Sequence, residues 1–79
     1  MASTLNDHVA AEIRAELARQ RRSARKLAAE LKWTVPYMSR RMTGEIPLDM
    51  DDIEAIAAAL NVPLAALLPQ EAEAPGGPA

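Results

Sequence analysis

The sequence predicts an all-α domain of five short helices, and three observations support this fold class. The chain of 79 residues is long enough for one domain with a small core. Apolar residues make up 49% of it, dominated by alanine, with no Phe and a single Trp and Tyr, a composition that favours closely packed helices. Apolar residues also recur at helical spacing in successive segments, and helix-capping residues separate these segments.

The first two helices are predicted in the N-terminal half. The first runs from about Thr4 or Asn6 to Arg21, with an apolar stripe at every fourth position: Leu5, Val9, Ile13 and Leu17. The second, of about ten residues, begins after the N-cap residue Ser23. Its apolar residues again have helical spacing: Leu27, Ala28 and Leu31.

A third helix is predicted between Thr34 and Gly44. Thr34 is a good N-cap, and Gly44 can take the left-handed conformation that ends helices. Met38 and Met42, four residues apart, would face the core. Pro36 in the first turn loses no helical hydrogen bond, since the N–H groups there have no partner within the helix, so it marks the helix start.

Two further helices and a tail complete the chain. Asp49 is the N-cap of the fourth helix, with Asp52 three residues on in place of the Glu of a capping box, and Asn61 can end it. Its apolar face is Met50, Ile53, Ile56, Ala57 and Leu60. Pro63 starts a short fifth helix with Leu64, Leu67 and Leu68. We expect a domain over residues 1–69 and a disordered, acidic, Pro/Gly-rich tail over 70–79.

The composition argues against several classes of protein. Without cysteine there is neither a disulfide framework nor a thiolate metal site, and His8 has no second His or Cys beside which to bind a metal. The apolar runs are too short to span a membrane and the N-terminus is unlike a signal peptide, which indicates a cytoplasmic protein. No nucleophile–base pair or glycine-rich phosphate loop is present, so we expect no enzyme activity, no cofactor and no small-molecule substrate.

The charges are segregated along the chain. Residues 14–41 hold all nine basic residues and two acids, a net charge of +7, whereas residues 42–79 hold seven acids and no base. One basic face could therefore meet a polyanion. The alternative is a solvated charge pattern that keeps a small domain soluble.

Residues 23–44 predict two short helices joined by a turn of about three residues. Such a turn holds two helices at a steep angle, and the helix-turn-helix motif uses it to place its second helix in the major groove of DNA. The sequence SARKLAAELKWTVPYMSRRMTG in this segment resembles the phage repressor and Cro-type (Xre-like) helix-turn-helix family. The resemblance extends from about Val9 to Leu68 and implies a compact five-helix, lambda-repressor-like domain.

Three positions depart from the family's usual pattern. Ala24 replaces a Gln that contacts phosphate, and Lys32 replaces a Gly of the turn. Arg41 stands at a commonly apolar position, so it could lie beside the core or reach a phosphate.

The resemblance implies which residues contact DNA. Val35, Pro36 and Arg40 fall on positions that face base edges, flanked by Tyr37 and Ser39; Arg40 can contact guanine in a bidentate manner. The phosphate-contacting candidates are Arg21, Arg22, Arg25, Lys26, Arg41 and Thr43. The alternatives are a solvated surface for the charged residues, and helix-start packing for Val35, Pro36 and Tyr37.

The resulting hypothesis is a sequence-specific regulator of transcription that binds a double-stranded DNA operator. By resemblance it is a repressor like a small phage Cro or immunity repressor, in a bacterial or phage-infected cell. A homodimer is expected, at least on DNA, through Leu64, Leu67 and Leu68, unless these leucines complete the monomer core. The alternative function is a protein-interaction module, such as an antitoxin or anti-repressor, that uses the acidic C-terminal half.

Overall fold

The computed structural model describes residues 4–69, which form four α-helices and one 3-10 turn. The helices are α1 (Thr4–Gln20), α2 (Ala24–Leu31), α3 (Val35–Thr43) and α4 (Met50–Leu60), and the 3-10 turn η1 spans Leu64–Leu67. The all-α prediction is therefore confirmed, but the predicted fifth helix is only a single 3-10 turn. The predicted tail lies outside the described residues.

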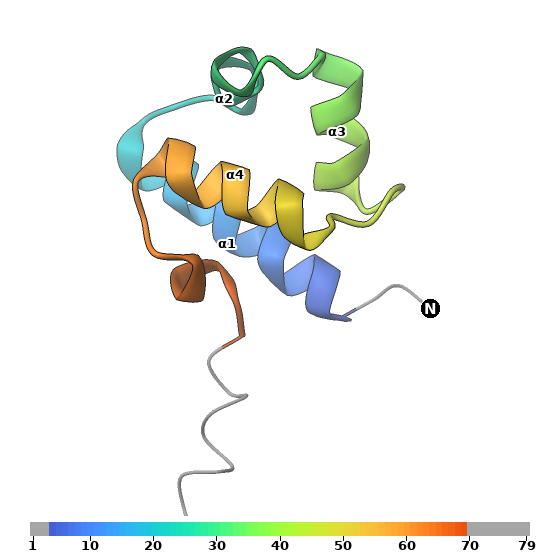
Figure 1. Ribbon diagram of the computed structural model, residues 1–79, viewed down its shortest axis with the longest axis vertical. Helices are drawn as coiled ribbons and strands as arrows, with labels where there is room; N and C mark the ends of the chain where they lie inside the picture. The colour runs from blue at the N-terminus through green and yellow to red at the C-terminus, as the bar shows by residue number, and fades with distance from the viewer. Residues whose placement is uncertain (1–3, 70–79) are drawn as a thin grey trace, which may run out of the picture.

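The two longest helices, α1 and α4, pass through the middle of the domain, with α2 and α3 on one side of them and η1 on the other (Figure 1). One core joins all of these elements, and its fully buried side chains include Ile13, Leu27, Ile56, Leu60 and Leu67. Among residues 4–69, no helix is both long and apolar enough to cross a membrane.

The helix starts follow the predicted caps. The side chain of Ser23 accepts a hydrogen bond from the Lys26 N–H at 3.0 Å, and that of Thr34 accepts one from the Tyr37 N–H at 3.2 Å. At α4 the capping box of Asp49 and Asp52 is formed. Each cap satisfies an N–H group that the first turn of a helix leaves without a partner.

Helix α2 ends at a left-handed residue that is not glycine. Lys32 has φ of 62°; its N–H donates to the carbonyl of Ala29 and the N–H of Trp33 donates to that of Ala28, at 3.1 and 2.8 Å. These two bonds form a Schellman motif, which usually has Gly at the left-handed position. The turn therefore keeps its conformation despite Lys32, with the strain of a side chain in the left-handed region.

Two apolar residues predicted to face the core are on the surface. Leu5 is 55% exposed and Met50 is 52% exposed. Leu5 is in the first turn of α1 and Met50 is the first residue of α4, so each lies at a helix end, before the body of its helix reaches the core. The rest of both stripes is buried as predicted: Val9, Ile13, Leu17, Ile53, Ile56, Ala57 and Leu60.

Candidate nucleic-acid interface

Helices α2 and α3 form a helix-turn-helix unit whose outer helix is α3 (Figure 1). The inner sides of the pair are apolar: Leu27, Ala28, Met38 and Met42 are buried. Ala28 is small and 1% exposed, which agrees with a close approach of the two helices. The remaining sides of α3 are therefore the ones that decide what the unit can bind.

Four of the five predicted base-contacting residues lie on one exposed strip of α3. They are Val35, Pro36, Ser39 and Arg40, all exposed to solvent. Val35 and Ser39 are four residues apart, as are Pro36 and Arg40, so the four form two adjacent rows on the helix. Within residues 4–69 the Arg40 guanidinium makes no hydrogen bond or ion pair, which leaves all its donors available to a ligand.

Tyr37, the fifth candidate, points away from this strip. Its hydroxyl donates a hydrogen bond to Asp52 Oδ1 on α4 at 3.0 Å, and its ring centre lies 4.7 Å from that of Trp33. The hydrogen bond to the carboxylate raises the pKa of the Tyr37 phenol, and burial raises it further. Of the two roles considered for Tyr37, the structure shows packing within the protein, since its hydroxyl is already bound to Asp52.

Arg41 also turns toward α4. Its Nε lies 3.2 Å from Asp52 Oδ2, its Nη1 donates to the Tyr37 carbonyl at 3.3 Å, and its guanidinium carbon lies 3.4 Å from the centre of the Tyr37 ring. The side chain is 15% exposed. Of the two roles considered for Arg41, the structure shows the position beside the core, and the predicted phosphate contact is not the arrangement observed.

The side chain of Asp52 joins these two residues, a role that the sequence did not reveal. Its carboxylate accepts hydrogen bonds from Tyr37, from Arg41 and from the main-chain N–H of Asp49, the last at 3.3 Å. The sequence predicted only the capping bond. The available signal was Arg41 at a position that is commonly apolar, four residues after Tyr37, because a charged group held beside a core needs a partner of opposite charge.

Some of the residues predicted to contact phosphate have side chains free to bind a ligand, and others already have partners within the protein. Arg25 and Lys26 in the first turn of α2 are exposed, as is Arg21 in the turn before it, and none has an internal side-chain partner among residues 4–69. Arg22 forms an ion pair with Glu30 and donates to the carbonyl of Ala59 at 3.1 Å. Arg22 is therefore engaged in holding α2 and α4 together.

Thr43 is exposed at the C-terminal end of α3, but its hydroxyl already has local partners. It donates to the carbonyl of Arg40 at 3.2 Å and accepts from the N–H of Glu45 at 3.4 Å. The N–H groups at the start of α2 and the free cations beside them are the stronger anion-binding groups of this surface.

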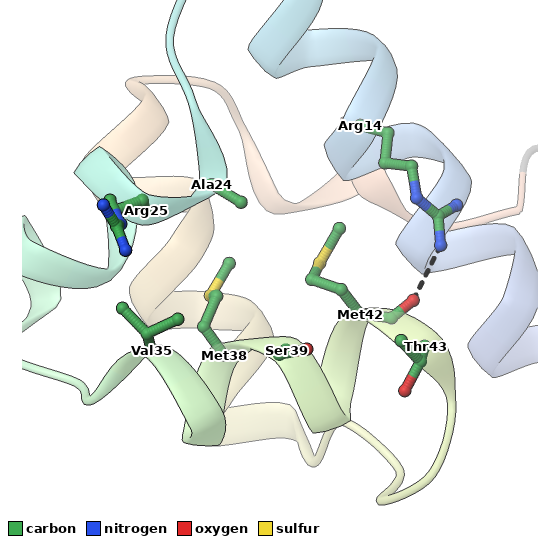
Figure 2. Close-up of a pocket in the computed structure, with 8 residues that line it drawn as sticks. All are labelled: Arg14, Ala24, Arg25, Val35, Met38, Ser39, Met42 and Thr43. Atoms are coloured by element: carbon green, nitrogen blue, oxygen red, sulfur yellow. Dashed lines mark hydrogen bonds between the residues drawn. The ribbon is translucent and has the colours of Figure 1, made fainter.

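A hollow of about 230 Å³ lies between α1, α2 and α3, beside the exposed strip. Figure 2 shows Met38 and Met42 directed into it from α3, with Arg25 of α2 at one side and Arg14 of α1 at the other. The Nη2 of Arg14 donates to the Met42 carbonyl at 2.7 Å. The role of Arg14 is not predictable from the sequence, since nothing in its spacing indicates that α1 meets the end of α3.

The leucines predicted for dimerisation are not equivalent. Leu67 is 1% exposed and completes the monomer core, which was the alternative to a dimer contact. Leu64 and Leu68 are half-buried and pack against that core.

No three His, Asp or Glu residues of the described part of the chain lie together in a way that could hold a metal ion.

An α2–turn–α3 unit whose outer helix carries an exposed strip with one cation, Arg40, that is unpaired within residues 4–69 defines a helix-turn-helix DNA-binding domain. In agreement, the sequence pattern of the helix-turn-helix domain family matches residues 8–69, and the chain belongs to this family of DNA-binding regulators, which are not enzymes. The crystal structure of the clp gene regulator ClgR from C. glutamicum superposes with a TM-score of 0.75 at 22% sequence identity, covering 98% of this chain and 96% of that chain. This likeness shows a shared fold. No curated protein sequence gives a match.

Proposed function

We propose that this protein binds a specific double-stranded DNA sequence and represses transcription by occupying it, as a small Cro-type or immunity repressor does. The observation that carries the proposal is the exposed strip of Val35, Pro36, Ser39 and Arg40, in which the Arg40 guanidinium has no partner within residues 4–69. In a helix-turn-helix unit the second helix enters the major groove, so this strip would face the base edges.

Arg40 is the principal base-reading residue of the proposal. Its free guanidinium can donate two hydrogen bonds to O6 and N7 of guanine, which discriminates against other bases by roughly 1–3 kcal/mol. Val35 and Pro36 would offer apolar contacts to a thymine methyl group, and the Ser39 hydroxyl can donate or accept. Tyr37 is left out of the proposed reading surface because Asp52 holds its hydroxyl.

Phosphate binding is assigned to the cations that remain free in the structure. Arg21, Arg25 and Lys26 flank the N-terminus of α2, and exposed Lys32 lies in the turn before α3. If about four phosphates are neutralised per chain, the logarithm of the binding constant should fall with that of the salt concentration at a slope of about −3.6 for one chain and about −7.2 for a dimer.

The proposal includes binding as a homodimer to two half-sites about one helical turn apart. The half-buried Leu64 and Leu68 support a contact near η1, since they leave some apolar surface uncovered. Leu67 is not part of this contact. The test is whether the preferred DNA sequence is palindromic and whether one duplex carries two protein chains.

The decisive experiment is a selection from random duplex DNA at two salt concentrations, followed by binding assays on variants. Arg40→Ala should relax base choice at one position per half-site, whereas Arg25→Ala should weaken binding to all sequences alike and flatten the salt slope. Arg19→Ala removes the same charge from an α1 residue whose guanidinium is paired with Glu16, and it is the matched control. Equal losses on every sequence for Arg40→Ala would contradict its reading role.

A second candidate function is capture of a basic protein partner, as an antitoxin or anti-repressor would do. It is favoured by Met50, which is exposed beside the exposed acids Asp51 and Glu54 on α4. Reversing both acids to lysine should abolish partner capture and leave DNA binding intact. A gain in DNA affinity without loss of any partner would count against this function.

A further inference from the structure

Helix α3 is held by two kinds of contact that differ in how well they fix its orientation. Its buried apolar side chains are Met38 and Met42. Methionine is unbranched and adapts its shape to its surroundings, so these two side chains fill the core but specify the rotation of the helix poorly. Directional hydrogen bonds are therefore needed to fix α3.

The carboxylate of Asp52 supplies such bonds. It accepts from Tyr37 at 3.0 Å and from Arg41 at 3.2 Å, two residues one turn apart on the same side of α3. Asp52 is itself fixed, because it belongs to the capping box that starts α4. With side-chain exposures of 15% for Arg41 and 8% for Asp52, water competes little for these bonds.

We propose that Asp52 is a positioning residue: acting through Tyr37 and Arg41, it fixes the rotation of α3 about its own axis and so directs Arg40 at the bases. The DNA-reading part of this inference rests on the proposed function. Arg40 adjoins Arg41 in the chain, so it points about 100° away around the helix. A bidentate contact tolerates only about 0.5 Å or 10–20° of error, so a loosened α3 would lose base discrimination before it lost general attraction to DNA.

The competing role for Arg41 is to leave Asp52 and bind a phosphate. That movement would leave the Asp52 carboxylate, which is 8% exposed, without its cation. Breaking such a pair leaves a buried charge uncompensated, which costs more than an exposed phosphate contact regains. The observed arrangement therefore favours positioning over direct contact.

The test compares three variants of the full chain with a matched control. Asp52→Asn keeps the shape of the side chain and removes its charge. Arg41→Met and Tyr37→Phe each remove one of the α3 side chains that bind Asp52, and they leave the capping box of α4 unchanged. Glu45→Gln makes an equivalent neutralisation at an exposed residue between α3 and α4 and is the control. If Asp52→Asn fails to fold, the two α3 variants still answer the question.

Two measurements are made at a temperature where every variant is fully folded. The first is amide hydrogen exchange of α3 relative to α1 in the free protein. The second is the affinity for the selected DNA site relative to a site changed at the base read by Arg40, together with the affinity for an unrelated duplex. We expect faster exchange in α3 and about a tenfold loss of discrimination for Asp52→Asn and Arg41→Met, with affinity for the unrelated duplex changed by less than about twofold.

A double variant sharpens the result. Asp52→Asn with Arg41→Met should discriminate no worse than either single variant, because the two substitutions remove the same interaction.

Unchanged discrimination and exchange in the folded variants would overturn the proposal. So would tighter binding of Asp52→Asn to all sequences with a salt slope steeper by about 0.9, because Arg41 would then be a phosphate ligand. Absence of DNA binding by the unaltered protein would overturn the proposed function instead, and the exchange data alone would then decide whether Asp52 fixes α3.

Discussion

Arg14 of α1 donates a hydrogen bond from Nη2 to the main-chain carbonyl of Met42, across 2.7 Å and 28 residues of sequence. Met42 is in the last turn of α3, where carbonyl groups lack a partner within the helix and carry the negative end of the helix dipole. A cation there satisfies a carbonyl and ties the end of α3 to α1. Together with Asp52 beside Tyr37 and Arg41, it gives α3 a polar attachment on each of two neighbouring helices.

Removing the Arg14 bond should therefore destabilise the domain. We expect Arg14→Ala to lower the free energy of unfolding by about 1 kcal/mol, since the bond is charge-assisted but partly open to water. Arg25→Ala, which removes the other arginine beside the hollow, should change it by less than about 0.5 kcal/mol because Arg25 has no internal partner among residues 4–69. Urea unfolding measures both, and equal effects would show that the Arg14 bond contributes nothing.

The methionines of the chain provide a test of the core. Met38→Ala should destabilise the fold by about 2–5 kcal/mol, because Met38 is 2% exposed and its truncation leaves a cavity. Met50→Ala should cost less than about 0.5 kcal/mol, since Met50 is 52% exposed. Thermal unfolding of the two variants should thus give clearly separated midpoints. A comparable cost at Met50 would mean that its side chain is buried in solution, as in a dimer.

The turn between α2 and α3 contains a strained residue that can be relieved. Lys32 has φ of 62°, a region that costs about 1–2 kcal/mol for a residue with a Cβ and nothing for glycine. Part of the gain from Lys32→Gly is lost to the greater freedom of the unfolded chain, so we expect a net stabilisation of about 0.5–1 kcal/mol. Lys32→Ala removes the same charge without relieving φ and should not stabilise. A fall in stability for the glycine variant would show that the left-handed turn is not strained.

Local sequence rules predicted the fold well because short-range interactions set its boundaries. Ser23, Thr34 and Asp49 each start a helix through a bond to a residue three positions on, and Gly44 and Asn61 end helices in the left-handed conformation. Such interactions depend only on neighbours in the chain. The helical content of the segment after Pro63 was overestimated, because four residues close a 3-10 turn as readily as they begin an α-helix.

The candidate site was only partly predictable, and the failures have a common cause. Periodicity places Tyr37 and Arg41 on one side of α3, but it does not say which helix that side meets. Their partner Asp52 lies 15 and 11 residues away, in a different helix. The hydrogen bond of Arg14 could not be predicted for the same reason, since its partner is 28 residues away. Side chains whose roles depend on such long-range contacts require the tertiary structure.

The hydrogen bond between Tyr37 and Asp52 can be followed by titration of the Tyr37 hydroxyl, since the chain contains a single tyrosine. The hydrogen bond to Asp52, helped by burial and by the charge of Asp52, raises the pKa of the phenol above its usual value of 10.0. Folding favours the neutral phenol, so its contribution to stability is complete below the unfolded-state pKa and is lost as pH rises through the higher folded-state pKa. We expect the tyrosinate absorbance of the folded protein to appear at higher pH than after unfolding in urea.

Tyr37→Phe isolates this effect from the alkaline titration of the lysines, which both proteins share. The stability of the unaltered protein relative to Tyr37→Phe should be constant from neutral pH to about 9 and should decline above about 10. Asp52→Asn should bring the titration of Tyr37 back toward its usual value. A Tyr37 that titrates at the same pH in the folded and the unfolded chain would show that its hydroxyl is not held by Asp52 in solution, and would return Tyr37 to the set of residues free to contact DNA.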